Sequence, residues 1–376
     1  MKLKKIFLLL NICSFILVSA QFQLSDPMAT KETSNLYNNL IKAQKKGYFI
    51  GHQDALAYGV YWKYKEGRSD VLEVVNDFPA VYGWEIGDIE LGRKENLDGV
   101  PFKLIKTFIR QAHERGGVIT ISWHANNPIT GKTAWDVSNK SISEILPGGN
   151  KNKLFHSYLE KVADFLEDLK DKDGTPIPIL WRPWHEHTGN WFWWGVDSSS
   201  QDEYKALFRY SLDYLRKDRG LHNLISVYNT GIEFNSAEQY LERYPGDTYV
   251  DMFSFDAYQR SSPQESHLFG DKIDELLGIM TNAAKNHNKI PAIGEIGYNQ
   301  IPDSRWFTEA LMPVLNKHEF SYILFWRNAG FKKENNEVEY YLPFKGHSAA
   351  NDFLKFKGNK KTLFEKEARK MKLYEE

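Results

Sequence analysis

Eight short apolar runs constrain the fold of this 376-residue chain more than any other feature. They occupy residues 48–51, 80–84, 118–123, 179–184, 224–228, 250–255, 290–293 and 322–326. Each is followed by a polar loop and then by a stretch with helical periodicity. The helix-like stretches include residues 103–115, 154–169, 202–215, 236–244, 272–286 and 305–317. Strands that alternate with helices in this way indicate a parallel sheet joined by helical crossovers.

Two architectures fit such a set of strands, a closed barrel and an open doubly wound sheet. An open sheet is expected to carry a glycine-rich phosphate-binding turn, and the sequence has neither GxGxxG nor GxxxxGK[ST]. We therefore predict a (β/α)8 TIM barrel, which also leaves no strand edge exposed. Because no linker or repeat interrupts residues 30–345, we expect residues 21–376 to form one catalytic domain.

Residues 1–20 have the pattern of an export signal, with a basic start, an apolar stretch over 6–18 and the small end Val18-Ser19-Ala20. We expect cleavage after Ala20 and a periplasmic or extracellular protein. The only cysteine, Cys13, lies inside this segment, and bulky Ile12 before it argues against a lipoprotein anchor. No later segment approaches the roughly 20 apolar residues of a transmembrane helix.

Composition excludes some partners and raises the expectation of others. The formal net charge is -1 and no basic stripe is present, so we do not expect nucleic acid as a partner. The aromatic content of 14% is high for a soluble protein. We expect the run over residues 191–194 to form an exposed aromatic patch in a loop, which is typical of a binding site. The Lys- and Glu-rich residues 356–376 predict a solvated terminal helix or a frayed tail.

Polar side chains follow the predicted strands at their carboxyl ends, where the chemistry of such barrels takes place. The set contains His52, Asp54, Glu85, Asp88, His124, Glu186, Asn229, Asp256, Tyr258, Glu295 and Arg327. Two of these, Glu186 and Glu295, end strands four and seven, which face each other across a barrel of eight. Glycoside hydrolysis needs two such carboxyls, one to protonate the leaving oxygen and one to attack or to activate water. The tryptophans near these strand ends offer flat faces on which sugar rings stack.

The run Arg182-Pro183-Trp184-His185-Glu186, with residues 189–195 after it, resembles the acid/base motif of glycoside hydrolase family 26, which includes many β-mannanases. Further similar motifs follow in family order between residues 30 and 335. They are Ser122-Trp123-His124 with Asn127-Pro128, residues 244–251, Phe255-Asp256-Ala257-Tyr258, Gly294-Glu295 and Phe325-Trp326-Arg327.

The resemblance implies a retaining enzyme that cleaves β-1,4-mannosidic bonds in mannan, glucomannan or galactomannan. By motif, Glu186 would be the general acid/base and Glu295 the nucleophile. The matched residues also imply sugar-binding or positioning roles: His185 near the nucleophile, His124 on the non-reducing side, Tyr258 beside Glu295, Trp326 as a floor, Trp191 on the leaving-group side and Arg327 at the next sugar. We expect no metal, no cofactor and a monomer.

Three alternatives stay open at this point. Related barrels cut β-1,3-1,4-glucan or β-1,3-xylan, and a few contacts to one hydroxyl decide between such substrates. His185 and His187 form an H-x-H pair that would suit a zinc-dependent barrel hydrolase, although in amidohydrolases this pair sits on the first strand. A carbohydrate-binding protein without catalysis would keep the aromatic residues, but it would not need both glutamates.

Overall fold

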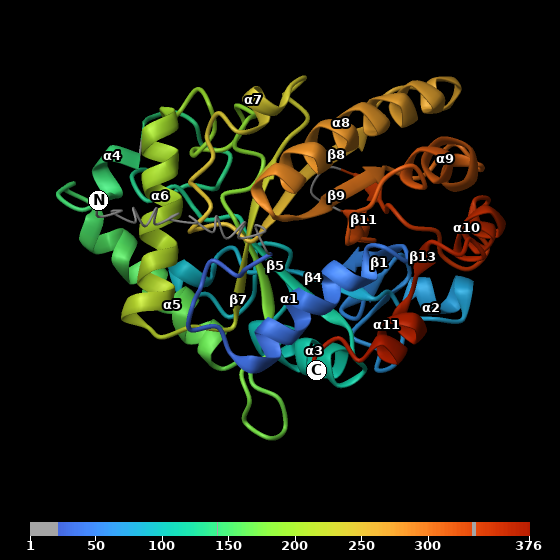
Figure 1. The fold of residues 1–376 in the computed structure, drawn as a ribbon, viewed down its shortest axis with the longest axis horizontal. Coiled ribbons are helices and arrows are strands. Elements are labelled where there is room, and N and C mark those ends of the chain that lie inside the picture. The colour runs from blue at the N-terminus through green and yellow to red at the C-terminus, as the bar shows by residue number, and fades with distance from the viewer. Residues whose placement is uncertain (1–21, 141, 333–335) are drawn as a thin grey trace, which may run out of the picture.

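The structure is a computed structural model that describes residues 22–140, 142–332 and 336–376. Within these ranges eight parallel strands form a closed barrel with helices around it (Figure 1). The barrel strands are β1 (Tyr48–Gln53), β4 (Val81–Glu85), β5 (Val118–Trp123), β6 (Ile179–Pro183), β7 (Leu224–Thr230), β8 (Met252–Gln259), β9 (Ile290–Tyr298) and β10 (Tyr322–Phe325). Neighbours along the chain pair in this order, and β10 closes the ring by pairing with β1. The predicted (β/α)8 barrel is confirmed.

Apart from α1, which precedes β1, the helices follow the strands and cover the outside of the barrel (Figure 1). They are α1 (Lys31–Ala43), α2 (Asp70–Val75), α3 (Phe102–Glu114), α4 (Ile142–Ile145), α5 (Asn152–Glu167), α6 (Gln201–Asp213), α7 (Ala237–Tyr240), α8 (Ser266–His287), α9 (Met312–Leu315), α10 (Ala350–Lys357) and α11 (Glu365–Met371). The predicted stretch 236–244 holds only the short α7, and 305–317 is divided between a π-helical stretch, Trp306–Leu311, and α9.

Two hairpins extend the loops beside the first and last strands of the barrel. They are β2 (Tyr58–Gly59) with β3 (Trp62–Lys63), and β11 (Gly330–Lys332) with β12 (Glu337–Glu339). Both follow the carboxyl end of a barrel strand, so they belong to the rim where the active sites of such barrels lie.

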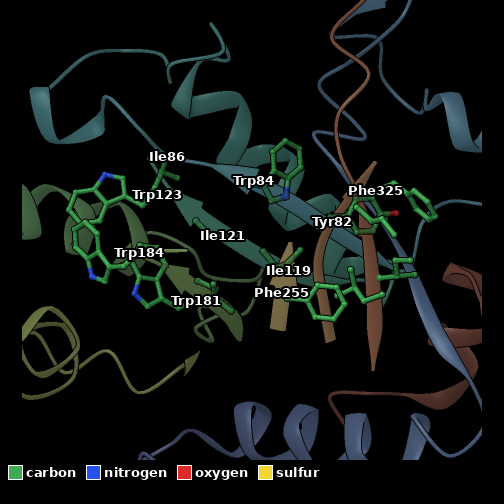
Figure 2. Packing of buried hydrophobic residues seen from close by; sticks show 14 of the residues in the cluster. Tyr82, Trp84, Ile86, Ile119, Ile121, Trp123, Trp181, Trp184, Phe255 and Phe325 are labelled. Carbon is green, nitrogen blue, oxygen red and sulfur yellow. The ribbon is translucent and has the colours of Figure 1, made fainter. Parts of the chain in front are cut away.

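Apolar side chains pack in two layers, because alternate residues of a barrel strand point inward and outward. The inner layer contains Phe49, Val118 and Leu180, and Leu36 and Leu40 of α1 belong to the same cluster and close the amino end of the barrel. The outer layer joins strands to helices and is rich in tryptophan, part of which Figure 2 shows. Trp181 lies in this outer layer, as its strand position predicts.

The segment after residue 356 packs against the barrel, so the expectation of a solvated or frayed tail is wrong. A short strand, β13 (Thr362–Leu363), pairs with β1, and α11 follows it. Phe364 and Leu373 are buried, and Glu365 forms a 2.8 Å ion pair with Arg115. Although this segment is rich in Lys and Glu, its apolar side chains form one face, and that face packs against the first strands of the barrel.

The predicted export signal, residues 1–20, lies outside the described residues. Among the helices of the described ranges, none has both the length and the apolar character that a membrane crossing requires.

Candidate active site

Glu186 stands on a turn of unusual backbone conformation directly after β6. Trp184 and Glu186 have φ angles of 53° and 51°, in the left-handed region that residues with a Cβ seldom adopt. Each such residue costs on the order of 1 kcal/mol and persists only where its surroundings fix it. The buried Trp184 indole donates to Ser211 Oγ at 3.0 Å, and the Gly189 N–H donates to the Glu186 carbonyl at 3.0 Å. The turn ends the strand and directs Glu186 over the barrel.

Glu295 lies on β9 where the pairing with β8 changes register. Phe255 pairs with Ile293, whereas Asp256 pairs with Glu295, so Gly294 is the extra residue of a bulge. A Cβ at Gly294 would lie 2.0 Å from Asn229 Oδ1. Only glycine fits this position, and the bulge places the Glu295 side chain inside the rim.

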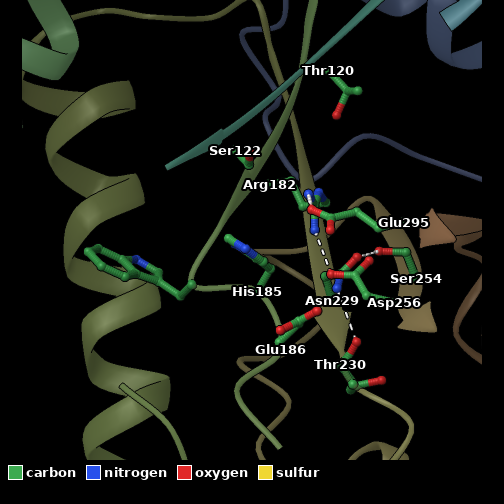
Figure 3. A network of polar contacts seen from close by, with 12 residues as sticks. Thr120, Ser122, Arg182, His185, Glu186, Asn229, Thr230, Ser254, Asp256 and Glu295 are labelled. Atoms are coloured by element: carbon green, nitrogen blue, oxygen red, sulfur yellow. Dashed lines mark hydrogen bonds and ion pairs between the residues drawn. The ribbon is translucent and has the colours of Figure 1, made fainter. Parts of the chain in front are cut away.

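The two glutamates predicted as the catalytic pair lie together, and Asp256 lies with them (Figure 3). One carboxylate oxygen from each of Glu186, Asp256 and Glu295 lies within 4.8 Å of the other two. Carboxyl groups about 5 to 5.5 Å apart are typical of retaining glycosidases, whereas inverting enzymes separate them by about 6.5 to 9.5 Å. The separation therefore fits a mechanism with direct attack by one carboxylate.

Arg182 and Tyr258 hold Glu295 from two directions. The buried Arg182 guanidinium donates to Asp256 Oδ2 at 2.8 Å and also to Glu295 Oε1. The Tyr258 hydroxyl donates to Glu295 Oε2 at 2.5 Å. Hydrogen bonds from a cation and a hydroxyl favour the anionic form of a carboxylate. Glu295 thus has the surroundings of a nucleophile.

Arg182 is a site residue to which the sequence interpretation gave no role. It lies in the quoted motif, next to Trp181, whose side chain packs in the outer layer. Because side chains alternate along a strand, Arg182 had to point inward, toward the rim carboxylates. That alternation was the signal that could have identified it.

Glu186 has the protonation behaviour of a general acid. Burial and the negative charge of Glu295 raise the pKa of Glu186 to about 7. The Trp191 indole N–H donates to Glu186 Oε2 at 2.6 Å, which partly opposes this rise. A carboxyl that keeps its proton near neutral pH can protonate a leaving oxygen.

His124 and His185 lie in contact beside the glutamates. Their Nε2 atoms are 3.1 Å apart, and Nδ1 of His124 lies 2.7 Å from Glu85 Oε2. Trp135, half exposed, stacks on the His124 ring with 5.2 Å between the ring centres. The structure thus brings together the two histidines predicted on the sugar-binding side.

Trp326 and Arg327 stand further along the rim, directly after β10. The Arg327 guanidinium lies 5.7 Å from the centre of the Trp326 ring and pairs with Asp98 and, at 2.9 Å, with Glu339. Arg327 also lines a groove of about 830 Å³ between the loops after β1, β4 and β10. These ion pairs tie the β4 loop to the β11–β12 hairpin at one end of the site.

The aromatic run after Glu186 is mostly core, so the expectation of an exposed patch over residues 191–194 is wrong. Phe192, Trp193 and Trp194 are 2%, 0% and 0% exposed, and only Trp191 is partly accessible. Trp193 Nε1 donates to the Ala125 carbonyl and Trp194 Nε1 to the His185 carbonyl, each at 2.8 Å. The run folds back to support the loops after β5 and β6. Phe192, Trp193 and Trp194 are therefore a scaffold for the strained turn rather than a platform for sugars.

The described residues do not favour the zinc alternative. His187 is buried between the rings of Tyr204 and Tyr228, at 4.1 and 4.8 Å between ring centres. Within the described ranges, one group of three side chains has potential metal-ligand atoms close together: the carboxylates Glu186, Asp256 and Glu295. Neither histidine of the H-x-H pair belongs to this group.

Comparisons with known proteins agree with the fold and the motifs. The profile of glycosyl hydrolase family 26 matches residues 25–337. A GH26 β-mannanase from Bacteroides ovatus is 42% identical, with a TM-score of 0.85 over 89% of this chain and 95% of that chain. A modular endo-β-1,4-mannanase from Cellulomonas fimi is 30% identical, with a TM-score of 0.82 over 92% of this chain and 78% of that chain. The mannan endo-1,4-β-mannosidase of Bifidobacterium adolescentis is 32% identical over 90% of this chain, and the match spans 35% of that relative's length. The chain belongs to glycosyl hydrolase family 26.

Proposed function

We propose that this chain is a retaining glycosidase that hydrolyses β-1,4-mannosidic linkages in mannan, glucomannan or galactomannan. The observation that carries the proposal is the approach of Glu186 and Glu295 to within 4.8 Å at the carboxyl end of the barrel. Arg182 and Tyr258 hold Glu295 ready to attack. The substrate is inferred from the relatives, which are named as β-mannanases.

In the first step, Glu295 Oε attacks the anomeric carbon of the sugar. The glycosidic C–O bond breaks, and Glu186 gives its proton to the departing oxygen. The product of this step is a glycosyl ester on Glu295, and Glu186 is left as a carboxylate. Because the ester carries no charge, the repulsion that kept Glu186 protonated is gone.

In the second step, a water molecule attacks the same carbon from the side that the leaving group vacated. Glu186 accepts a proton from this water, the ester bond to Glu295 breaks, and both side chains return to their starting states. Two displacements at one carbon leave its configuration unchanged. Removal of either glutamate is expected to cost several powers of ten in rate, since no neighbouring group can replace it.

The remaining predicted residues are proposed to bind or orient the sugar. Trp191 lies beside the acid and fits the leaving-group side, because its N–H already holds Glu186. Trp326 is half buried beside Arg327, so its ring suits a sugar face while the guanidinium suits the next hydroxyls. Tyr258 orients the nucleophile. His124 is proposed to contact the sugar on the non-reducing side, and His185 to lie near the nucleophile and the bound sugar.

The activity test uses the chain without residues 1–20, incubated with linear mannan, glucomannan and lichenan, a mixed-linkage β-glucan. Release of reducing ends is expected from mannan and glucomannan, and it should vanish in Glu186→Gln and Glu295→Gln. Faster release from lichenan would refute the substrate and leave the mechanism standing. Polymer that is bound but not shortened would refute catalysis altogether.

We also propose that residues 1–20 direct export and are removed, and that the mature enzyme works as a monomer in the periplasm or outside the cell. Amino-terminal sequencing of the exported protein is expected to begin at Gln21. Retention of Cys13 in a lipid-modified protein would contradict this, and light scattering would test the monomer.

A further inference from the structure

A row of three buried side chains leads from the second barrel strand to the residue before the acid. Glu85, His124 and His185 are 0%, 8% and 1% exposed. Glu85 Oε2 lies 2.7 Å from His124 Nδ1, and His124 Nε2 lies 3.1 Å from His185 Nε2. The double displacement described above assigns no task to Glu85.

The hydrogen bonds around Glu85 fix its charge. Its two oxygens accept from the backbone N–H groups of Gly87 at 2.5 Å and His124 at 2.8 Å, and from Ser122 Oγ at 2.7 Å. Burial alone would raise the pKa of Glu85, but His124 and these donors lower it below its usual value. Glu85 is therefore an anion, and it can only accept a hydrogen bond from His124 Nδ1.

The charge of Glu85 in turn fixes the charge of His124. Burial alone would lower the pKa of His124, but the adjacent Glu85 carboxylate outweighs it and raises that pKa. The raised pKa favours the imidazolium form of His124, in which Nδ1 donates to Glu85 and Nε2 donates to His185. Two ring nitrogens 3.1 Å apart need one donor and one acceptor, so His185 accepts at Nε2 as a neutral ring when His124 is an imidazolium. Burial, Arg182 and His124 hold the pKa of His185 well below its usual value.

The imidazolium acts on the acid through space. Burial and Glu295 raise the pKa of Glu186, whereas the positive charge of His124 lowers it. Arg182 on β6 and the Trp191 N–H act in the same direction as His124. The charged or titratable groups that face Glu186 are Glu295, Asp256, Tyr258, His124 and Arg182.

We propose that Glu85 is a positioning residue that keeps His124 positively charged and thereby sets the pH range in which Glu186 serves as the acid. The inference rests on the proposed function, in which Glu186 protonates the leaving oxygen. Glu85 does not touch the reacting atoms. Its charge acts on Glu186 through His124, and water does not screen the Glu85–His124 ion pair because the pair is buried.

The test is the pH dependence of kcat/KM for mannotetraose in Glu85→Gln. Glutamine keeps the shape and most hydrogen bonds but removes the charge, so His124 becomes neutral near pH 7. Without that cation, Glu186 keeps its proton to higher pH, and the alkaline limb of the profile moves upward by about half a unit or more. A limb that stays in place while His124 loses its charge would overturn the proposal.

Glu90→Gln is the matched control. Glu90 is also buried and lies in the loop after β4, where it accepts from Trp123 Nε1 at 3.0 Å and the Asn126 N–H at 2.7 Å. Its loss disturbs that loop but leaves the Glu85 and His124 pair intact, so the alkaline limb is expected to stay in place. An equal shift in both variants would mean that loop damage moves the limb, and the role of Glu85 would be refuted.

A second measurement does not depend on activity. The ring ¹⁵N shifts of His124 are expected to show two protonated nitrogens at pH 7 in the wild type and one in Glu85→Gln. A neutral His124 ring in the wild type would overturn the proposal even if mannan is cleaved. If Glu186→Gln retained full activity instead, the proposed function would fail, while the charge on His124 could still be read from these shifts.

Discussion

Trp191→Phe removes one hydrogen bond from the acid and keeps an aromatic ring for the sugar. The indole N–H donates to Glu186 Oε2 at 2.6 Å. A hydrogen bond to a charged group contributes about 1.5 to 3 kcal/mol, and one pKa unit corresponds to about 1.4 kcal/mol. Because the donor stabilises the carboxylate, its loss raises the pKa of Glu186 from about 7 by roughly 1 to 2 units. The acid then stays protonated to higher pH.

The assay is kcat/KM for mannotetraose between pH 4 and pH 10, which reports the free enzyme. The wild-type alkaline limb is expected near pH 7, and that of Trp191→Phe about one unit or more higher. Trp193→Phe is the control, because its N–H donates to the Ala125 carbonyl and not to Glu186. A limb that does not move in Trp191→Phe would show that Glu186 is not the titrating acid, or that the indole does not hold it.

Three further changes test the site and its supports. Gly294→Ala would place a methyl 2.0 Å from Asn229 Oδ1, so we expect the unfolding free energy to fall by about 1 to 3 kcal/mol and kcat/KM to be lower. Wild-type values of both would contradict the bulge geometry. Arg182→Met leaves the Glu295 carboxylate buried without its cation, and urea unfolding should show about 3 to 5 kcal/mol of destabilisation; a stable, active variant would refute the ion pair. Leu373→Ala should cost about 2 to 5 kcal/mol if the carboxyl-terminal segment is packed, and nothing if it is frayed.

The sequence predicted the barrel well because its strands are short apolar runs with regular spacing. Each of the eight runs contains or overlaps a barrel strand. The two catalytic candidates were also predictable, since strands four and seven face each other once a barrel of eight is assumed. The motifs added the assignment of acid and nucleophile, which strand order alone does not give.

The errors came from side chains whose environment depends on distant segments. Trp193 and Trp194 looked exposed because their loop is rich in glycine and asparagine, yet their N–H groups bind backbone carbonyls of Ala125 and His185. The terminal residues looked solvated because Lys and Glu outnumber the apolar positions, although Leu373 is buried. Neither the indole hydrogen bonds nor the burial of Leu373 can be predicted from the residues that lie next to them in the sequence.

The most direct test of the central claim is the stereochemistry of the product. One carboxylate oxygen of Glu186 lies within 4.8 Å of one oxygen of Glu295, closer than the roughly 6.5 to 9.5 Å by which inverting enzymes separate the two groups to admit a water molecule. Hydrolysis of mannotetraose followed by ¹H NMR is therefore expected to show the β-anomer of the new reducing end first, with the α-anomer appearing only by slow mutarotation. Initial formation of the α-anomer would show inversion and would contradict Glu295 as the nucleophile.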